Sequence, residues 1–221
     1  MARKIFIIVM LAVASLALTQ NVPAQTQGSG AAAAQSPTRQ PAPQPHNHDQ
    51  MKTEERSPAQ TYFTDVVLVN QDGEKMRLYS DVLKGKTVVI SSFFTTCTSV
   101  CPPLNRNLEK LQNALGDRFG RDVFIVSISV DPETDTPPRL KDYSNKFHAK
   151  PGWLFLTGKK ENVDWALYKV GQYVEAKDDH VTGIIVGNEA TGLWKKAFGM
   201  GKVDELLELI RSVLNDKSGG Q

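Results

Sequence analysis

The sequence VVISSFFTTCTSVCP occupies residues 88–102 and contains the only two cysteines of the chain, Cys97 and Cys101. Its first half, through Phe94, is a nearly continuous apolar run rich in β-branched and aromatic side chains, which predicts a strand buried on both faces of a sheet. After Pro102, leucines follow at the spacing of an amphipathic helix, at Leu104, Leu108, Leu111 and Leu115. The cysteines therefore lie where a buried strand gives way to a helix.

The two cysteines stand four positions apart, as Cys-x-x-x-Cys, and not in the Cys-x-x-Cys pattern of thiol–disulfide oxidoreductases. On a single helix this spacing would place the thiols one above the other on the same face. Two thiols that close can bind a soft metal ion together or form a disulfide. A disulfide across so short a loop removes little chain entropy, so we expect a metal site or a reversible redox pair rather than a structural crosslink.

The first 24 residues have the pattern of a signal peptide. Arg3 and Lys4 precede an apolar run over residues 5–18, and the Val-Pro-Ala sequence at residues 22–24 offers a cleavage site. The alternative is an uncleaved membrane anchor at residues 5–18, although this run is shorter than the roughly 20 residues that span a bilayer. In both cases we expect an exported protein, periplasmic or on the extracytoplasmic face of a membrane.

The composition of residues 25–60 predicts a disordered tether, because Gln, Ala, Pro, Ser and Gly dominate and large apolar residues are nearly absent. His46 and His48 lie in this segment, where a solvated linker is favoured over a weak site for a divalent ion. Without residues 1–24 the chain has 24 basic and 24 acidic residues. A formal charge near zero, with no basic block, argues against nucleic acid as a partner and against strong electrostatic attachment to lipid.

Beyond the tether, the pattern predicts one α/β domain over residues 61–216 and a frayed tail at residues 217–221. Asn70-Gln71-Asp72-Gly73 predicts the turn of an N-terminal β-hairpin. Alternating strand and helix patterns then predict a mixed β-sheet flanked by helices. With a terminal β-hairpin and helix, and with the cysteines at a strand-to-helix step, this pattern predicts a thioredoxin-like fold. Open sheets of this kind bind ligands at the carboxyl ends of strands, which is where the cysteines fall. We expect strands at 64–68, 75–78, 87–94, 123–130, 153–156, 181–186 and 193–198, and helices at 104–115, 136–147, 163–170 and 203–214.

Two thiolates suit Cu(I), whereas Cu(II) prefers additional nitrogen or oxygen donors. A third ligand for a metal held by the cysteines would therefore come from histidine. His148 falls at the end of a predicted helix, where we expect a capping or surface role. His180 opens the strand at 181–186, and its position alone leaves a surface role and a ligand role equally open. We expect Asp131 to end a strand and Asp135 to help start a helix, with support of the cysteine site as the alternative for Asp131.

Three blocks of the sequence stand out together: Phe93-x-x-Thr96-Cys97-x-x-x-Cys101-Pro102, the stretch SVDPETDTP at residues 129–137, and Asp179-His180 before a strand. In their order and roughly in their separations, these blocks resemble the Sco/SenC family. The resemblance covers about residues 60–215. It implies a thioredoxin-like fold, an exported or membrane-tethered location, and copper, as Cu(I) or Cu(II), bound through Cys97, Cys101 and His180.

The resemblance also implies a copper metallochaperone that assists assembly of the CuA site in subunit II of cytochrome c oxidase. The expected partner is that subunit or another exported copper protein, and we expect a monomer. The chain departs from the usual family pattern at Thr98 and Ser99 between the cysteines, at Val181 after the histidine, and in the turn at residues 186–192. Thr98 and Ser99 are not at ligand positions in the family. The departures therefore bear on redox potential and on the acceptor protein more than on the metal.

Two other functions remain open. If the pair is redox-active, the domain is a thiol–disulfide oxidoreductase that reduces exported cysteines, in which Cys97 attacks, Cys101 resolves and His180 tunes the thiolate. A peroxidase on the same fold is the weaker alternative, because we find no second activating group near Cys97. Copper delivery needs no catalytic residue, so whether the protein is an enzyme depends on which of these functions it has.

Overall fold

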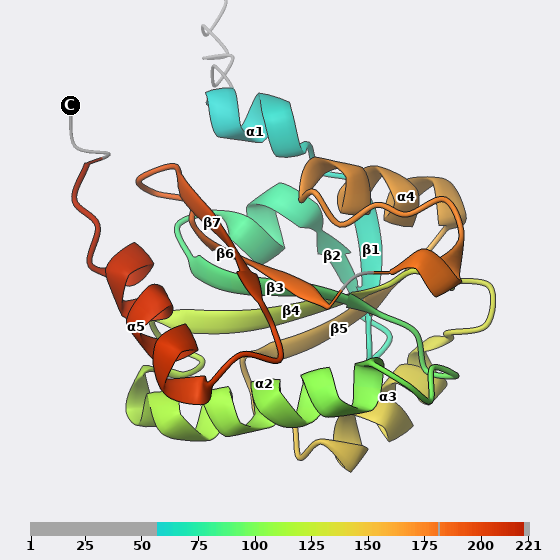
Figure 1. Ribbon diagram of the computed structural model, residues 1–221. Coiled ribbons are helices and arrows are strands. Elements are labelled where there is room, and N and C mark those ends of the chain that lie inside the picture. The colour runs from blue at the N-terminus through green and yellow to red at the C-terminus, as the bar shows by residue number, and fades with distance from the viewer. Residues whose placement is uncertain (1–56, 181, 219–221) are drawn as a thin grey trace, which may run out of the picture. The chain divides into compact units, whose positions relative to one another are not determined.

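A seven-stranded sheet runs through the part of the chain that the computed structural model describes, residues 57–180 and 182–218 (Figure 1). Its strands are β1 (Val67–Asn70), β2 (Lys75–Arg77), β3 (Thr87–Phe93), β4 (Val123–Ser129), β5 (Trp153–Thr157), β6 (Gly183–Asn188) and β7 (Leu193–Phe198). They lie in the order β2-β1-β5-β4-β3-β6-β7. Strands β3, β4 and β5 are parallel, whereas β1 is antiparallel to β5 and β6 is antiparallel to β3, so the sheet is mixed.

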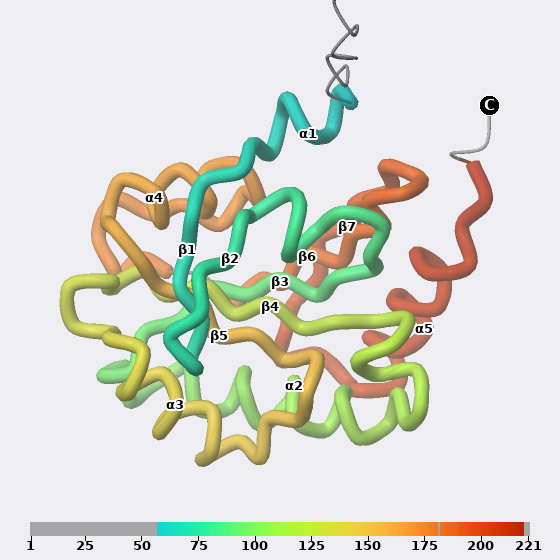
Figure 2. The backbone as a smooth tube through the Cα atoms, turned by 180° about the vertical axis from the view of Figure 1, so that it is seen from behind, coloured from blue at the N-terminus to red at the C-terminus, as the bar shows by residue number. Residues whose placement is uncertain are grey.

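Helices cover both faces of the sheet, as Figures 1 and 2 show from opposite sides. The α-helices are α1 (Pro58–Phe63), α2 (Cys101–Leu115), α3 (Pro137–Lys146), α4 (Lys160–Lys169) and α5 (Val203–Leu214). Three shorter segments are η1 (Leu78–Leu83), which is π-helical, and the 3-10 turns η2 (Gly116–Arg118) and η3 (Lys177–Asp179). The core on one face is shared with α2, α3 and α5, and the core on the other face with α1, η1 and α4.

Strand β3 is buried along its whole length because both of its faces are covered. Successive side chains of a strand point to opposite faces. Val89 and Phe93 accordingly pack in the core beside α2 and α5, whereas Val88 and Ile90 pack in the core beside η1 and α4. The prediction of a strand buried on both sides is therefore confirmed, and the chain leaves the sheet at Phe93 on its way to the first cysteine.

The predicted N-terminal hairpin is confirmed, since β1 pairs antiparallel with β2 and Gly73 in the turn has a φ of +82°. Its first strand begins at Val67 and not at Thr64, because Thr64 caps α1 with a positive φ. The predicted strand at 193–198 and helix at 203–214 match β7 and α5. The sequence did not indicate α1, η1 or η3, which are too short, at three to six residues, to show a helical period.

The predicted signal peptide and most of the predicted tether, with His46 and His48, lie outside the described residues. Helix α1 begins at Pro58, close to the end of the segment that the sequence assigned to the tether. Within residues 57–180 and 182–218, no helix combines the length and the apolar character needed to cross a membrane.

Candidate metal centre

The two cysteines meet at the beginning of α2 but do not share that helix. Cys101 is its first residue, and Cys97 lies in the preceding loop, so the stacking that this spacing gives within a single helix does not apply here. The backbone N–H of Cys101 donates to Cys97 Sγ at 3.4 Å, which occupies a donor that the helix cannot use internally. Pro102 follows in the first turn, where its missing N–H costs nothing. The Cys97 sulfur therefore lies at a helix N-terminus, which favours a thiolate.

The two thiols have different environments. Cys97 is 7% exposed, whereas Cys101 is fully buried. Burial acts to raise the pKa of Cys97, but hydrogen bonds from Cys101 and Ser99 outweigh it and hold this pKa below that of an ordinary cysteine. Burial, followed by the hydrogen bond with Cys97, raises the pKa of Cys101 far above its ordinary value. Cys97 is therefore the thiol that ionises more readily and that solvent reaches more easily.

His180 approaches the cysteines from the loop between α4 and β6. Its Nε2 lies 3.0 Å from Cys101 Sγ and 3.8 Å from Cys97 Sγ. Its Nδ1 lies 2.8 Å from the carbonyl oxygen of Lys177. Since a carbonyl oxygen only accepts, Nδ1 carries the proton, and Nε2 of the neutral ring keeps a lone pair facing the sulfurs. A histidine held by a backbone carbonyl in this way is oriented as metal-binding histidines are.

The two thiols and the imidazole together form a possible metal site. Their donor atoms all lie within 4.8 Å of one another, and both cysteines are free of disulfides. No other group of three Cys, His, Asp or Glu side chains in the described part of the chain could hold an ion. Two sulfurs and one imidazole nitrogen fit copper or zinc better than a hard cation. His148, by contrast, is on the surface, 78% exposed and 2.7 Å from Glu109 Oε1, which confirms the surface role expected for it.

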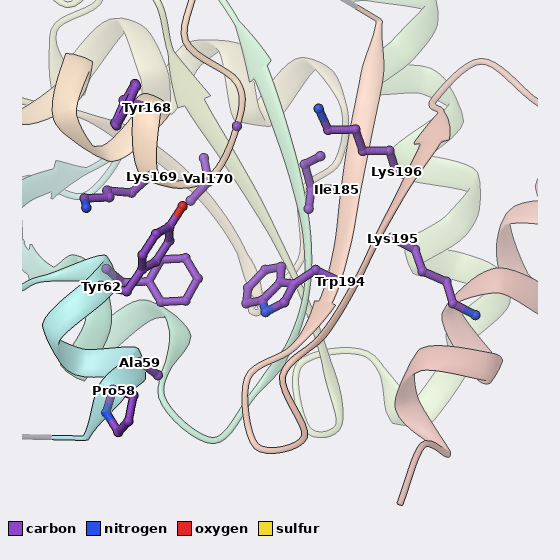
Figure 3. A pocket seen from close by; sticks show the side chains of 12 residues that line it. Pro58, Ala59, Tyr62, Tyr168, Lys169, Val170, Ile185, Trp194, Lys195 and Lys196 are labelled. Carbon is purple, nitrogen blue, oxygen red and sulfur yellow. The ribbon is translucent and has the colours of Figure 1, made fainter. Parts of the chain in front are cut away.

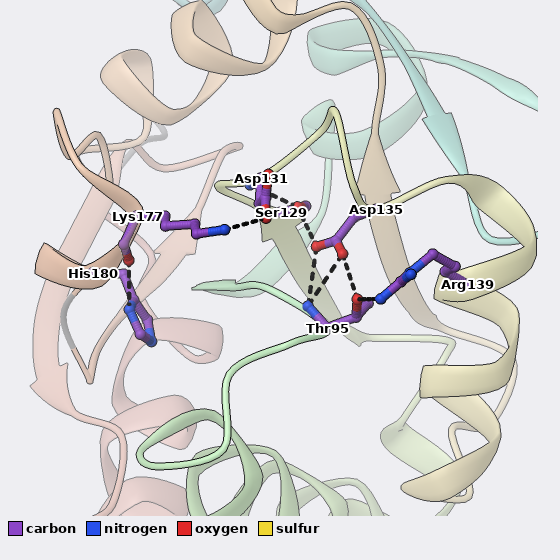
Figure 4. A network of polar contacts seen from close by, with 7 residues as sticks. All are labelled: Thr95, Ser129, Asp131, Asp135, Arg139, Lys177 and His180. Atoms are coloured by element: carbon purple, nitrogen blue, oxygen red, sulfur yellow. Dashed lines mark hydrogen bonds and ion pairs between the residues drawn. The ribbon is translucent and has the colours of Figure 1, made fainter.

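Asp135 fixes the start of the cysteine loop (Figure 4). This fully buried carboxylate accepts hydrogen bonds from the backbone N–H of Thr95, at 3.2 and 3.1 Å to its two oxygens, and from the Thr95 hydroxyl. It also accepts a hydrogen bond from Ser129 Oγ at 2.6 Å. The expectation that Asp135 helps to start α3 is wrong, because its bonds run to Thr95 and to the end of β4. Asp135 thus joins the loop that leads to Cys97 to the neighbouring parallel strand.

Asp131 contacts the segment that carries His180. Its Oδ2 lies 2.8 Å from Lys177 Nζ. The backbone carbonyl of this same lysine accepts the hydrogen bond from Nδ1 of the His180 ring. Burial acts to raise the pKa of Asp131, but hydrogen bonds from Lys177 and Thr134 and the charge of Lys177 lower it overall. Asp131 therefore contacts the residue that orients the His180 ring, and the supporting role that the sequence offered as the alternative stays a prediction. Lys177 was missed, because nothing in the sequence marks a lysine three residues before a histidine.

A separate apolar cavity of about 590 Å³ lies between α1, the end of α4 and strands β6 and β7 (Figure 3). Its lining includes Tyr62, Phe63, Val170, Ile185 and Trp194. Neither of the two cysteines lines this cavity, and His180 does not line it either. The cavity is therefore distinct from the possible metal site and supplies no ligand to it.

Comparison with known sequences places these features in a family. The SCO1/SenC family model matches residues 53–196. The SCO1 protein homolog of Bacillus subtilis is 38% identical over 94 residues, which are 42% of this chain and 47% of that protein. This chain spans about half the length of the curated relatives that it matches, SCO2-like proteins of Rickettsia among them.

Solved structures agree with the sequence matches. BsSco, described with a disulfide switch and as a member of the Sco family of cytochrome c oxidase assembly proteins, is 27% identical with a TM-score of 0.56, covering 68% of this chain and 92% of that one. Bradyrhizobium japonicum ScoI with copper bound is 26% identical with a TM-score of 0.56, covering 67% of this chain and 96% of that one. These neighbours are thioredoxin-like, which confirms the predicted fold class. Since the family model covers more than half of the sequence, including the cysteine pair and His180, the chain belongs to the SCO1/SenC family.

Proposed function

We propose that Cys97, Cys101 and His180 bind one copper ion and that the protein delivers this ion to an exported copper protein. The observation that supports the proposal is the convergence of the three donor atoms within 4.8 Å of one another. Two thiolates suit Cu(I), and the added imidazole nitrogen suits Cu(II). The copper-bound structure of B. japonicum ScoI, from the same family, supports copper as the ion.

Copper is cargo in this proposal, so the site must also release it. Cys97 is 7% exposed, whereas Cys101 is fully buried. A thiolate of the acceptor therefore replaces Cys97 first, while Cys101 still holds the ion. The acceptor that we propose is the CuA site in subunit II of cytochrome c oxidase, and the description of BsSco as belonging to a family of cytochrome c oxidase assembly proteins supports it. The signal-peptide pattern at residues 1–24 supports delivery on the extracytoplasmic side.

Anaerobic titration of the reduced protein with Cu(I) and with Cu(II) tests the binding step. We expect one ion per chain and, for Cu(II), strong sulfur-to-copper charge-transfer absorption. His180→Ala should lose this absorption and retain Cu(I) through the two thiolates. A Cys97→Ser/Cys101→Ser variant that still binds one copper per chain would contradict the proposal.

A transfer assay tests the delivery step separately. The copper-loaded protein is mixed with the metal-free copper domain of oxidase subunit II, and the absorption of the CuA centre is followed. We expect the centre to form faster than with the same copper supplied beside the double-serine variant. Equal rates would show that the protein binds copper without delivering it to this acceptor.

A thiol–disulfide reductase is the second candidate, and the difference between the two thiols favours it. The Cys97 thiolate would attack a partner disulfide and release one partner thiolate. Cys101 would then displace the second partner sulfur, leaving a Cys97–Cys101 disulfide and a partner reduced by two electrons, and an external dithiol would restore the pair. The two sulfurs lie within 4.8 Å, so closing to about 2.05 Å needs only a local movement. His180→Ala should spare this reaction while removing Cu(II) binding.

A further inference from the structure

The position of His180 depends on a short turn and not on a regular element. Residue 180 directly follows η3, and its backbone N–H donates to the carbonyl oxygen of Lys177 at 3.3 Å. The same carbonyl accepts the Nδ1–H of the ring at 2.8 Å. Both the backbone and the ring of His180 are thus attached to Lys177. A displacement of Lys177 would move Nε2 away from the sulfurs.

Lys177 is in turn attached to the body of the domain through its side chain (Figure 4). Its ammonium lies 2.8 Å from Asp131 Oδ2, and the Asp131 side chain is only 12% exposed. The ammonium also lies 5.4 Å from the centre of the Phe94 ring. That ring meets His180 edge-on, with centroids 5.0 Å apart. One lysine therefore contacts both the end of the sheet and the ring that packs on the histidine.

Asp131 is itself part of the network that holds the cysteine loop. Its backbone N–H donates to Ser129 Oγ at 3.0 Å, and Ser129 Oγ donates to Asp135 at 2.6 Å. Asp135 accepts the N–H of Thr95, two residues before Cys97. A continuous series of polar contacts therefore joins the loop that carries Cys97 to the loop that carries His180, and the Asp131–Lys177 ion pair is its link between the two loops.

We propose that the Asp131–Lys177 ion pair is a positioning device that holds His180 Nε2 against the two sulfurs and so sets the affinity of the site for Cu(II). The inference rests on the proposed copper site. Cu(II) needs the imidazole nitrogen, whereas two thiolates suffice for Cu(I). The ion pair therefore discriminates between the two oxidation states of the cargo, although neither residue contacts the ion.

The test compares Lys177→Gln, Asp131→Asn and the conservative Lys177→Arg with the unaltered protein. In the metal-free protein, hydrogen exchange of the Asp179 and His180 amides should be faster in the first two variants, because the ion pair no longer holds η3 to Asp131. Cu(II) affinity, measured by competition and by the sulfur-to-copper absorption band, should fall about tenfold, as for other residues that orient a metal ligand. Cu(I) affinity should change by less than about threefold, and Lys177→Arg should restore the Cu(II) affinity.

Lys141→Gln is the matched control, because it breaks a different ion pair, with Asp72 at 2.6 Å, that does not belong to this network. It should leave both exchange and Cu(II) affinity unchanged. If Lys177→Gln behaves like this control, the positioning role is overturned while the copper site stands. If the unaltered protein binds neither Cu(I) nor Cu(II), the proposed function fails, and exchange in the metal-free variants still decides whether the ion pair holds the histidine loop.

Discussion

His180 Nδ1 lies 2.8 Å from the carbonyl oxygen of Lys177, and this contact determines which ring nitrogen faces the cysteines. The two residues are three positions apart across a single 3-10 turn, so the contact is made locally by η3. The imidazole is therefore preorganised, and ligation through Nε2 requires neither a ring flip nor a change of tautomer.

The first prediction concerns that tautomer. In the metal-free protein at a pH where the ring is neutral, nitrogen-15 shifts should show His180 protonated at Nδ1 and unprotonated at Nε2. The reason is that the Lys177 carbonyl can accept a hydrogen bond but cannot donate one. His148 is the internal comparison, since its Nδ1 faces Glu109 on the surface. A His180 ring protonated at Nε2 would contradict the geometry of the proposed site.

The second prediction concerns Asp135. Asp135→Asn should destabilise the protein by about 3 kcal/mol, because a buried carboxylate that accepts bonds from Thr95 and Ser129 would be replaced by an amide with only one accepting oxygen. Urea unfolding measures the loss. The exposed Asp142 on α3 provides the control, and Asp142→Asn should change stability by less than about 0.5 kcal/mol. A similar small loss in both variants would show that the network does not contribute to stability.

The sequence predicted the central strands of the sheet well because they are buried on both faces. Such strands appear in the sequence as nearly unbroken apolar runs, as in β3 and β4. The spacing of the two cysteines and their place after a buried strand indicated a metal or redox site, and the family resemblance added His180 as the third ligand. From spacing alone, His180 was no better supported as a ligand than as a surface residue.

The contacts that hold the site could not be predicted, because they join residues far apart in the sequence through polar side chains. Asp135 bonds to Thr95 across 40 positions, and Lys177 pairs with Asp131 across 46 positions. Neither contact leaves a periodic pattern. Whether Cys97 and Cys101 lie on the same helix also depended on the residue at which α2 begins. Sequence patterns predict the ends of a helix less reliably than its existence.

The third prediction concerns stability in acid. The guanidinium and backbone N–H of Arg77 hold the pKa of Asp81 at about 2, below its ordinary value. Since the folded state has the lower pKa, Asp81 stabilises the protein above about pH 4, and this contribution is lost as the pH falls toward about 2. In urea unfolding from about pH 5 to about pH 2, the advantage of the unaltered protein over Asp81→Asn should therefore shrink. A constant difference between the two would contradict the lowered pKa.

The fourth prediction concerns the cross-strand pair of Gly187 and Trp194 beside the apolar cavity. A Cβ at residue 187 would lie 2.0 Å from Cε3 of the Trp194 ring, so Gly187→Ala forces the indole out of its place and should cost about 2 kcal/mol or more. Trp194→Ala removes the clash. The double variant should therefore lose less stability than the two single losses combined, as measured by urea unfolding. Simple additivity would show that the ring already has room to move.

The fifth prediction concerns the reactivity of the two thiols. Cys97 is slightly exposed and has a lowered pKa, and Cys101 is fully buried and has a raised pKa, so a limiting amount of iodoacetamide should modify Cys97 first. We expect at least about a tenfold preference, identified by peptide mass spectrometry of the reduced, metal-free protein. Because the pKa of Cys97 is below that of an ordinary cysteine, its reaction should rise at lower pH than that of free cysteine. Equal modification of both thiols would contradict the assignment of Cys97 as the residue that exchanges first with a partner.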